Sequence, residues 1–291
     1  MGADIKAIRA RIKSVDSTRH ITKAMQLVAS SKIKRACTRK DASEFYRQVM
    51  LDAFSDLAVE KSSYSVQRDK SLPVLYIIIA GDRGLAGGYN NNIFRSAATV
   101  LRDCDFVLPI GKRAVEHYTH HMSSKNGGII TDKYISVEKF TSEDSAAVAQ
   151  TAKKMYDEGK ISAITLIYTR FESMLSQNPD ITYLLPLGKN KNSTKQESPA
   201  EAKSEGYHAL VEYEPSPEEV LSAVIPEYIS GVLYSSVAES YASELAARRN
   251  AMDTATKNAD DMMENLSLKY NRARQGSITQ EITEIVAGAN A

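Results

Sequence analysis

Cysteine and tryptophan are almost missing from this chain of 291 residues, which has no tryptophan and two cysteines, Cys37 and Cys104. Two cysteines cannot build the disulfide framework of a small secreted protein, so the composition favours a reducing compartment. The first residues lack the apolar core of a secretory signal. No unbroken apolar run reaches the roughly 18 residues that a membrane span needs. We therefore expect no direct transmembrane segment.

Net charge is also nearly absent, because 37 Lys and Arg residues face 36 Asp and Glu residues. The even total hides an asymmetry. Up to Lys40 there are 11 basic residues and 2 acidic ones, whereas from Tyr207 onward 13 acidic residues face 6 basic ones. Two ends of opposite sign could attract each other or face partners of opposite sign. The basic end alone would suit nucleic acid or anionic lipid, but the acidic end would neutralise much of its field.

Glycine and proline do not occur between Ala3 and Leu72. Within this segment apolar residues recur at spacings of three and four, which is typical of a helix with a narrow apolar seam. The series is Ile5, Ile8, Ile12 and Val15, followed less regularly by Met25, Val28, Ile33, Phe45, Val49 and Leu57. The pattern predicts one helix of about 80 Å, at 1.5 Å per residue, over residues 1–58.

Residues 73–188 have a different character, with short apolar runs separated by helical patterns. Val74–Ala80 is a continuous apolar run, as expected of a strand that is covered on both faces. Further strands are predicted at 106–110, 161–171 and 181–187, and helices at 91–102, 113–121 and 145–157. Alternating strands and helices predict an α/β domain of three layers, Rossmann-like, inserted between two long helices. Residues 189–206 are polar and are expected to form a loop.

A second long helix is predicted within residues 207–291. Ser216-Pro217-Glu218-Glu219 is a capping box with proline at the first helical position. Its apolar stripe includes Val232, Leu245, Met252, Met262, Leu266 and Ile278. Two lone helices of this length are stable only if each buries its stripe, so we expect an antiparallel two-helix coiled coil.

The register of this coiled coil can be estimated by placing Leu57 near Val220. Facing residue numbers then add up to about 275. Ile12 would meet Met262 or Met263, and Arg248 would lie across from Met25 or close to it. The end of the second helix would have no partner inside the chain and would project as a tip.

The turn-rich segment Gly81–Asn90 follows a strand and precedes a helix, which raises the question of phosphate binding. It lacks the Lys-Ser/Thr ending of a Walker A loop and the spacing of a dinucleotide fingerprint, so a tight packing turn is the favoured interpretation. His117 and His121 have a helical metal-ligand spacing but no matching third ligand. No Ser-His-Asp grouping or carboxylate pair is evident. We expect no catalytic, cofactor-binding or metal site.

Three segments together resemble one family. They are Ile21-Thr22-Lys23-Ala24-Met25, the run Asp82-Arg83-Gly84-Leu85-Ala86-Gly87-Gly88-Tyr89-Asn90, and the ending from Asn271 to Ala289. Their order and full-length coverage are similar to the gamma subunit of bacterial F-type ATP synthases. Many relatives carry cysteine where Ala86 stands, and alanine where Gly276 and Ser277 stand. Neither departure alters a group needed for chemistry.

The resemblance implies a rotary central stalk that couples ion (proton) flow through the membrane ring to ATP synthesis or hydrolysis at the beta subunits and regulates ATPase activity. The implied partners are the hexameric head of alpha and beta subunits, the epsilon subunit and the c-subunit ring, with no nucleic acid and no cofactor. The implied location is peripheral, on the cytoplasmic face of the bacterial cell membrane. A nucleotide-binding or nucleic-acid-binding α/β protein with a coiled-coil arm stays as the alternative.

The resemblance also implies which residues contact partners. The first group would face acidic loops of the beta subunits, with Met25 as a soft sliding contact. It comprises Lys23, Met25, Lys32 and Arg35, with Arg248 opposite on the second helix. The second group would contact the head near the tip, and it comprises Gln275, Thr279, Glu281 and the apolar Ile282.

Overall fold

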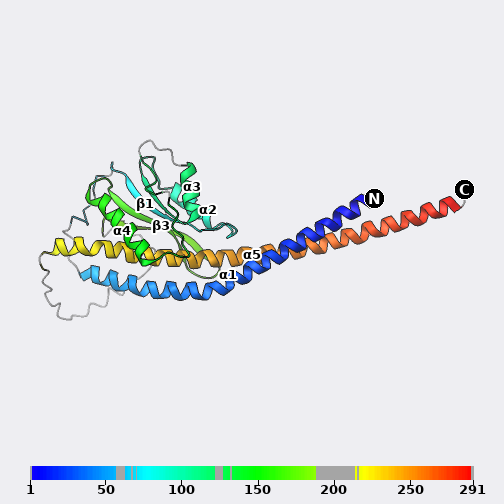
Figure 1. Ribbon diagram of the computed structural model, residues 1–291, viewed down its shortest axis with the longest axis horizontal. Helices are drawn as coiled ribbons and strands as arrows, with labels where there is room; N and C mark the ends of the chain where they lie inside the picture. Colours follow the sequence, from blue (N-terminus) through cyan, green and yellow to red (C-terminus); the bar gives the residue numbers. More distant parts are fainter. Residues whose placement is uncertain are drawn as a thin grey trace. The chain divides into compact units, whose positions relative to one another are not determined.

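The computed structural model describes residues 2–56, 63–66, 68–69, 71–121, 127–131, 133–187, 214 and 216–289. Two long helices enclose a set of shorter elements in the chain order (Figure 1). The elements are α1 (Gly2–Asp56), β1 (Val74–Ile79), α2 (Tyr89–Ala98), β2 (Phe106–Ile110), α3 (Lys112–His121), α4 (Ser142–Asp157), β3 (Ala163–Phe171), β4 (Gln177–Leu185) and α5 (Pro217–Ala289). The polar segment 189–206 lies outside the described residues.

The chain divides into two compact units, and both long helices contribute residues to each of them. The first unit comprises residues 1–32, 85–87 and 248–291. The second unit comprises residues 33–84 and 88–247. The first unit is therefore built from the start of α1 and the end of α5, and the second contains the sheet.

The sheet of the second unit has the strand order β2-β1-β3-β4. β1 pairs in parallel with β2 and β3, whereas β4 is antiparallel to β3. β4 begins at Gln177, four residues before the start that the sequence indicated. The sequence pattern missed this start because the first residues of the strand are polar and include Pro179. An edge strand tolerates proline, since one of its sides has no ladder partner.

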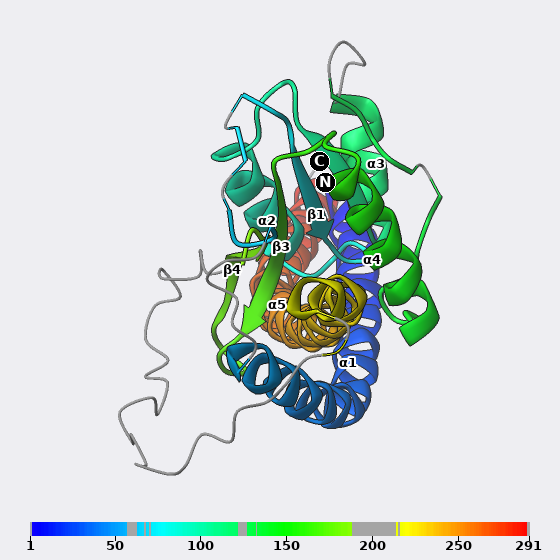
Figure 2. The same ribbon diagram turned by 90° about the vertical axis from the view of Figure 1, so that its left-hand side faces the viewer.

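The core lies between the sheet and two helices of the second unit. Leu75, Ile77 and Ile79 alternate along β1 and share one buried cluster with residues of α4 and α5, such as Tyr156 and Ile229. α2 packs near β3 and β4 and lies on the other side of the sheet from α4 (Figure 2). The arrangement confirms the predicted three-layer α/β fold joined to two long helices.

One window of α5 is long and apolar enough, by length and composition, to cross a membrane. However, 61% of that window is buried inside the protein. Its apolar residues belong to the core of the second unit, including Ile225, Ile229 and Leu233. The burial favours a core helix, because the apolar surface is already covered by the sheet.

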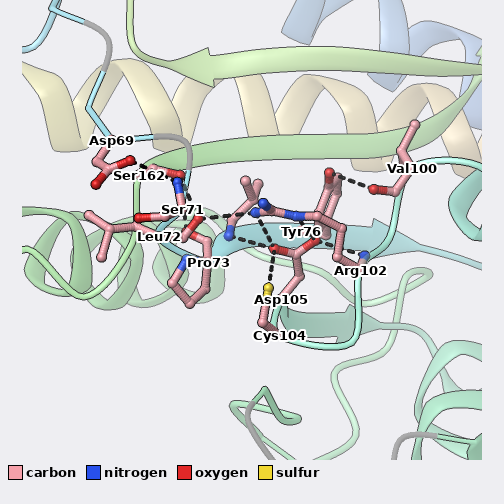
Figure 3. Close-up of polar contacts among 11 residues, drawn as sticks. Asp69, Ser71, Leu72, Pro73, Tyr76, Val100, Arg102, Cys104, Asp105 and Ser162 are labelled. Carbon is pink, nitrogen blue, oxygen red and sulfur yellow. Dashed lines mark hydrogen bonds and ion pairs between the residues drawn. The ribbon is translucent and has the colours of Figure 1, made fainter.

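A buried carboxylate ties together the starts of two strands (Figure 3). Asp105, which is fully buried before β2, accepts hydrogen bonds from the backbone N–H of Val74 at 2.8 Å and from that of Arg102 at 2.9 Å. The Arg102 guanidinium also donates to Asp105 at 2.8 Å and to the Leu72 carbonyl at 3.0 Å. Nearby Tyr76 donates to the Val100 carbonyl at 3.1 Å, and burial raises the pKa of Tyr76 to about 12.

Candidate partner-contact surface

The first unit contains a regular two-helix seam. In α1 a series of half-buried and buried positions follows alternating spacings of four and three. The series is Ile8, Ile12, Val15, Arg19, Thr22, Gln26 and Ala29. In α5 the matching positions are Met252, Thr256, Ala259, Met263, Leu266, Tyr270, Ala273 and Ser277. The seam is thus apolar toward the start of α1 and polar further along.

Five residues that the sequence pattern placed in the apolar stripes are exposed instead, namely Val28, Phe45, Val49, Met262 and Ile278, and two of them lie next to seam positions of the first unit. The exposed fraction of Val28 is 56%, and the buried position next to it is Ala29. Likewise Met262 is 44% exposed, while Met263 is half-buried in the seam. The heptad phase explains both differences, because it continues through small or polar residues that a search for large apolar side chains passes over.

Polar pairs across the seam set its register. The hydroxyls of Thr22 and Thr256 are 2.8 Å apart, and Gln26 donates to Asp253 at 2.7 Å. Arg19 forms an ion pair and hydrogen bond with Asp260. A polar residue at a seam position finds its partner in only one alignment, so such pairs specify register and orientation.

The observed register is antiparallel, as predicted, but differs from the estimate by about one helical turn along α5. Met25 is level with α5 residues near 254, and Arg248 is level with α1 residues near 31. The expected pairings of Ile12 with Met262 or Met263, and of Met25 with Arg248, are therefore wrong. The error came from the starting assumption of the estimate, which placed the end of the first helix, at Leu57, beside Val220.

The outer face of α1 carries apolar side chains beside the predicted contact residues. Ile21, Leu27 and Val28 are exposed and lie within a few residues of Lys23 and Met25. This cluster was missed in the sequence, although extending the heptad phase from Ile8 places all three outside the seam. Exposed apolar side chains gathered on one helix face indicate a surface that a partner covers.

A loop of the first unit exposes a further apolar side chain. Leu85 is exposed and has a positive φ of 63°, which is unusual for a residue other than glycine. Gly87 also has a positive φ, of 59°, and a Cβ at this position would lie 3.6 Å from the Ala251 side chain on α5. The loop after β1 therefore packs against α5, in agreement with the packing turn that was favoured.

The end of α5 extends past the start of α1 (Figure 1). From Ile278 to Ala289 every residue is exposed, including Ile278, Ile282, Ile285 and Val286. In the observed register Ser277 is level with Gly2, the first residue of α1. The exposed stripe therefore begins just past the N-terminal end of α1. The described part of the chain thus leaves the apolar side of the tip uncovered.

The predicted contact residues fall into separate places. Lys23 is exposed and donates to Gln26 at 3.1 Å, while Met25, Lys32 and Arg248 are half-buried. All four belong to the first unit, whereas Arg35 is exposed and belongs to the second. The tip residues are exposed and also belong to the first unit, and they are Gln275, Thr279, Glu281 and Ile282. The tip group lies about 30 Å along α5 from the level of Met25, at 1.5 Å per residue.

The charged side chains near Met25 are tied to the helices. Asp253 accepts from Gln26 and from Lys257, the latter at 2.8 Å, and the hydrogen bond from Lys257 holds the pKa of Asp253 below its usual value.

The polar side chains of the tip also form bonds within α5. The Gln275 carbonyl accepts from the Thr279 hydroxyl at 2.9 Å. Glu281 accepts from Ser277 at 3.3 Å. These are local bonds, which leave the apolar groups on the same faces open to a partner.

The end of β1 is filled by the protein's own groups in the place where a nucleotide phosphate would bind in a doubly wound fold. The Asp82 carboxylate accepts from the backbone N–H of Lys112, at the start of α3, at 3.3 Å. It also accepts from the Ser136 hydroxyl at 2.7 Å and from the Val137 N–H at 3.3 Å. A bound anion would be repelled by this carboxylate, so the arrangement does not favour phosphate.

His117 has a packing role in the second unit. Its ring stacks on Phe94 with 4.0 Å between centroids and an interplanar angle of 2°. Among the described residues, no group of three or more His, Cys, Asp and Glu side chains is placed to hold a metal ion. The stacking accounts for His117 without a ligand.

Comparisons with known proteins agree on one family. A family model described as ATP synthase matches residues 4–291. The ATP synthase gamma chain of Ruminococcus albus is 40% identical over 292 residues, covering 97% of this chain and 96% of that protein. The sodium ion specific ATP synthase gamma chain of Acetobacterium woodii is 35% identical and covers 100% of this chain and 99% of that protein.

A solved structure supports the same fold. A chain of the Euglena gracilis mitochondrial ATP synthase aligns with a TM-score of 0.71 and 18% identity, covering 100% of this chain and 95% of that chain. The long helices and inserted α/β domain are therefore shared over the whole length. The chain belongs to the ATP synthase gamma chain family, the non-catalytic central-stalk subunit of the rotary ATP synthase.

Proposed function

We propose that the first unit of this chain turns inside a head of alpha and beta subunits. In this role the outer face of α1 around Met25 pushes on the beta subunits, and the α5 tip serves as the end of the shaft. The uncovered apolar stripe Ile278, Ile282, Ile285 and Val286 is the observation that carries the proposal. A helix end with such a stripe needs a surrounding partner.

The two contact groups have different chemistry and are assigned different tasks. Apolar contact is non-directional and scales with buried area, so it suits the tip, where each directional bond would have to break as the shaft turns. The basic side chains Lys23, Lys32 and Arg35 can attract or push acidic loops and are assigned to torque. Arg248, now level with Lys32, joins this group. The polar tip residues Gln275, Thr279 and Glu281 are assigned to contacts with the head beside Ile282.

The remaining partners are assigned through the family. Residues 73–188, as the α/β domain, would contact the epsilon subunit and the c-subunit ring, while residues 1–58 and 207–291 would form the shaft and residues 189–206 a connecting loop. The solved Euglena gracilis assembly is described as containing F1 and a c-ring. The complex to which the chain belongs is membrane-associated, and we place it on the cytoplasmic face of a bacterial membrane.

One relative is named as sodium ion specific, so the coupled ion can be the proton or sodium. The gamma chain described here offers no ion ligands, since its described residues hold no cluster of three metal-binding side chains. Ion choice would therefore rest with the membrane ring.

Charge reversal tests the division of labour. We change Lys23, Lys32 and Arg35 together to glutamate in the assembled complex, and compare it with a complex truncated before Ile282. The charge variant should assemble and lose much of its ATP-driven ion pumping, because the attraction to acidic loops becomes repulsion. The truncated variant should assemble less well but still rotate.

Ion pumping per ATP hydrolysed and single-molecule rotation are measured for both variants. The charge-preserving variant Lys23→Arg, Lys32→Arg and Arg35→Lys is the control, and it should leave pumping unchanged. Normal coupling in the variant with three glutamates would refute the proposed role of these charges. Complete loss of rotation in an assembled truncated complex would instead show that the tip is an essential pivot.

A further inference from the structure

A groove of about 570 Å³ lies in the second unit, away from the surfaces assigned above. It is formed where α1, the first turn of α4 and the first third of α5 come together. It is lined by small residues, two tyrosine rings and two glutamates, and these include Tyr46, Ala146, Gly231, Tyr234, Glu143 and Glu227.

One end of the groove already shows how a guanidinium is held there. Arg39 lies over the ring of Tyr234 with 4.9 Å to the ring centroid. It donates to the Tyr234 hydroxyl at 3.2 Å, to the Glu138 carbonyl at 3.3 Å and to the Phe140 carbonyl. Arg39 therefore belongs to the wall of the groove, because its three nitrogen atoms are each engaged within the chain.

The other end has the same aromatic element without a cation. Tyr46 is 46% exposed, and its ring packs so closely on Gly231 that a Cβ there would lie 2.7 Å from the ring. Glu143 and Glu227 are exposed, and within the described part of the chain neither forms an ion pair. Two carboxylates that line the same groove as an exposed ring attract a cation that has a flat apolar face.

We propose that this groove receives an arginine side chain from a neighbouring subunit of the assembled complex. A guanidinium can stack on the Tyr46 ring and donate to a carboxylate in the same plane, which a lysine ammonium cannot do. The groove has room for the apolar stem of the side chain over Ala146. The inference rests on the proposed function, because it needs an assembled complex to supply the arginine.

The test uses a thiol in the groove as a reporter. Cys37 and Cys104 are changed to serine, and Ala146→Cys is introduced in the full chain. Labelling by a maleimide dye is timed in the free chain and in the purified complex. We expect labelling in the complex to be slowed by roughly tenfold or more, because a seated side chain covers position 146. Thr151→Cys on the exposed side of α4 is the control for general shielding and should label at similar rates in both.

Charge variants then identify the occupant. Glu143→Gln with Glu227→Gln should restore labelling in the complex to within about twofold of the free chain, since the carboxylates are the recognition groups. The Glu143→Asp and Glu227→Asp pair should keep the protection. If the double variant does not assemble, the single Gln variants give the same readout.

Two results would overturn the inference while leaving the proposed function intact. Equal labelling of the Ala146→Cys variant in the free chain and in the complex would show that nothing occupies the groove. Protection that persists after both Gln substitutions would show an occupant recognised without charge. A chain that never co-purifies with alpha and beta subunits would instead contradict the proposed function.

Discussion

At the scale of single residues, buried polar groups do much of the work of joining elements. Asp105 is fully buried and accepts from the backbone N–H groups of Val74, the first residue of β1, and of Arg102, which precedes β2. A buried acceptor that serves several donors is worth more than one hydrogen bond, because its removal leaves each donor unsatisfied. Sequence patterns do not show such a role, since an aspartate in a turn looks like an ordinary surface residue.

Replacing this carboxylate should destabilise the fold. Asp105→Ala leaves the backbone N–H groups of Val74 and Arg102 without their acceptor, at about 1–3 kcal/mol for each buried group left unpaired. We expect the free energy of unfolding to fall by about 3 kcal/mol. Urea denaturation followed by circular dichroism measures it, with the exposed neighbour Asp103→Ala as the control. A loss below about 1 kcal/mol would contradict the assigned role.

A second residue-scale prediction concerns pH. Glu239 on α5 accepts from the Phe171 N–H at 2.9 Å, and desolvation by burial raises the pKa of Glu239. Glu44 also raises it, whereas Arg170 and Lys40 oppose the rise. The folded state holds the proton of Glu239 more tightly than the unfolded state does. The contribution of Glu239 to stability is therefore lost as the pH rises from the ordinary pKa of a glutamate through the raised pKa of the folded state.

Glu239→Gln removes this dependence and keeps an oxygen that can accept from Phe171. We expect the stability of the variant relative to the parent to be greater at about pH 8 than at about pH 4. Glu172→Gln is the matched control, because the hydrogen bond from Ser176 lowers the pKa of Glu172 and the sign is opposite. Denaturation series at both pH values measure the difference. A gain that is the same at both would contradict the account.

At the scale of elements, the long helices and the buried strands were the most predictable parts. The lack of glycine and proline between Ala3 and Leu72 and the apolar run Val74–Ala80 each indicate one structure with no competitor. The start of β4 was missed because Pro179 and its polar neighbours fit an edge strand only in the presence of β3. The seam was partly missed because its middle uses Thr22 and Gln26, whose role depends on partners far along the chain.

The corrected register makes a sharp prediction for crosslinking. With Cys37 and Cys104 changed to serine, Thr22→Cys and Thr256→Cys should oxidise rapidly to an internal disulfide, since the two hydroxyls are 2.8 Å apart. The pair Ile12→Cys and Met262→Cys, from the uncorrected register, should oxidise much more slowly. Non-reducing gels separate the products. Faster oxidation of the second pair would show that the seam is shifted by a turn.

The tip should matter for assembly and not for the stability of the chain. Ile282→Ser and Ile285→Ser change exposed side chains, so together they should alter the free energy of unfolding by less than about 0.5 kcal/mol. The same pair should weaken assembly with alpha and beta subunits. Met263→Ser, in the seam, is the control and should destabilise the isolated chain. Full-strength assembly of the tip variant would argue that no partner covers the stripe.

At the scale of the whole molecule, family membership explains features that would be faults in a free-standing protein. The exposed stripe on α5, the exposed Ile21, Leu27 and Val28 on α1, and opposite charges at the two ends all suit a subunit enclosed by others. The full-length match to gamma chains accounts for them together. Composition alone left nucleic acid open as a partner, and only the ordered motifs pointed to the ATP synthase.

The most direct measurement is the rotation of this chain within its complex. Leu175, at the turn between β3 and β4, is 86% exposed, so Leu175→Cys in a background without other cysteines can carry a bead. With the head fixed to glass, the bead should turn in one direction when ATP is added and stop when ATP is removed. A bead that stays still on complexes that hydrolyse ATP would contradict the account, because catalysis would then proceed without turning the shaft.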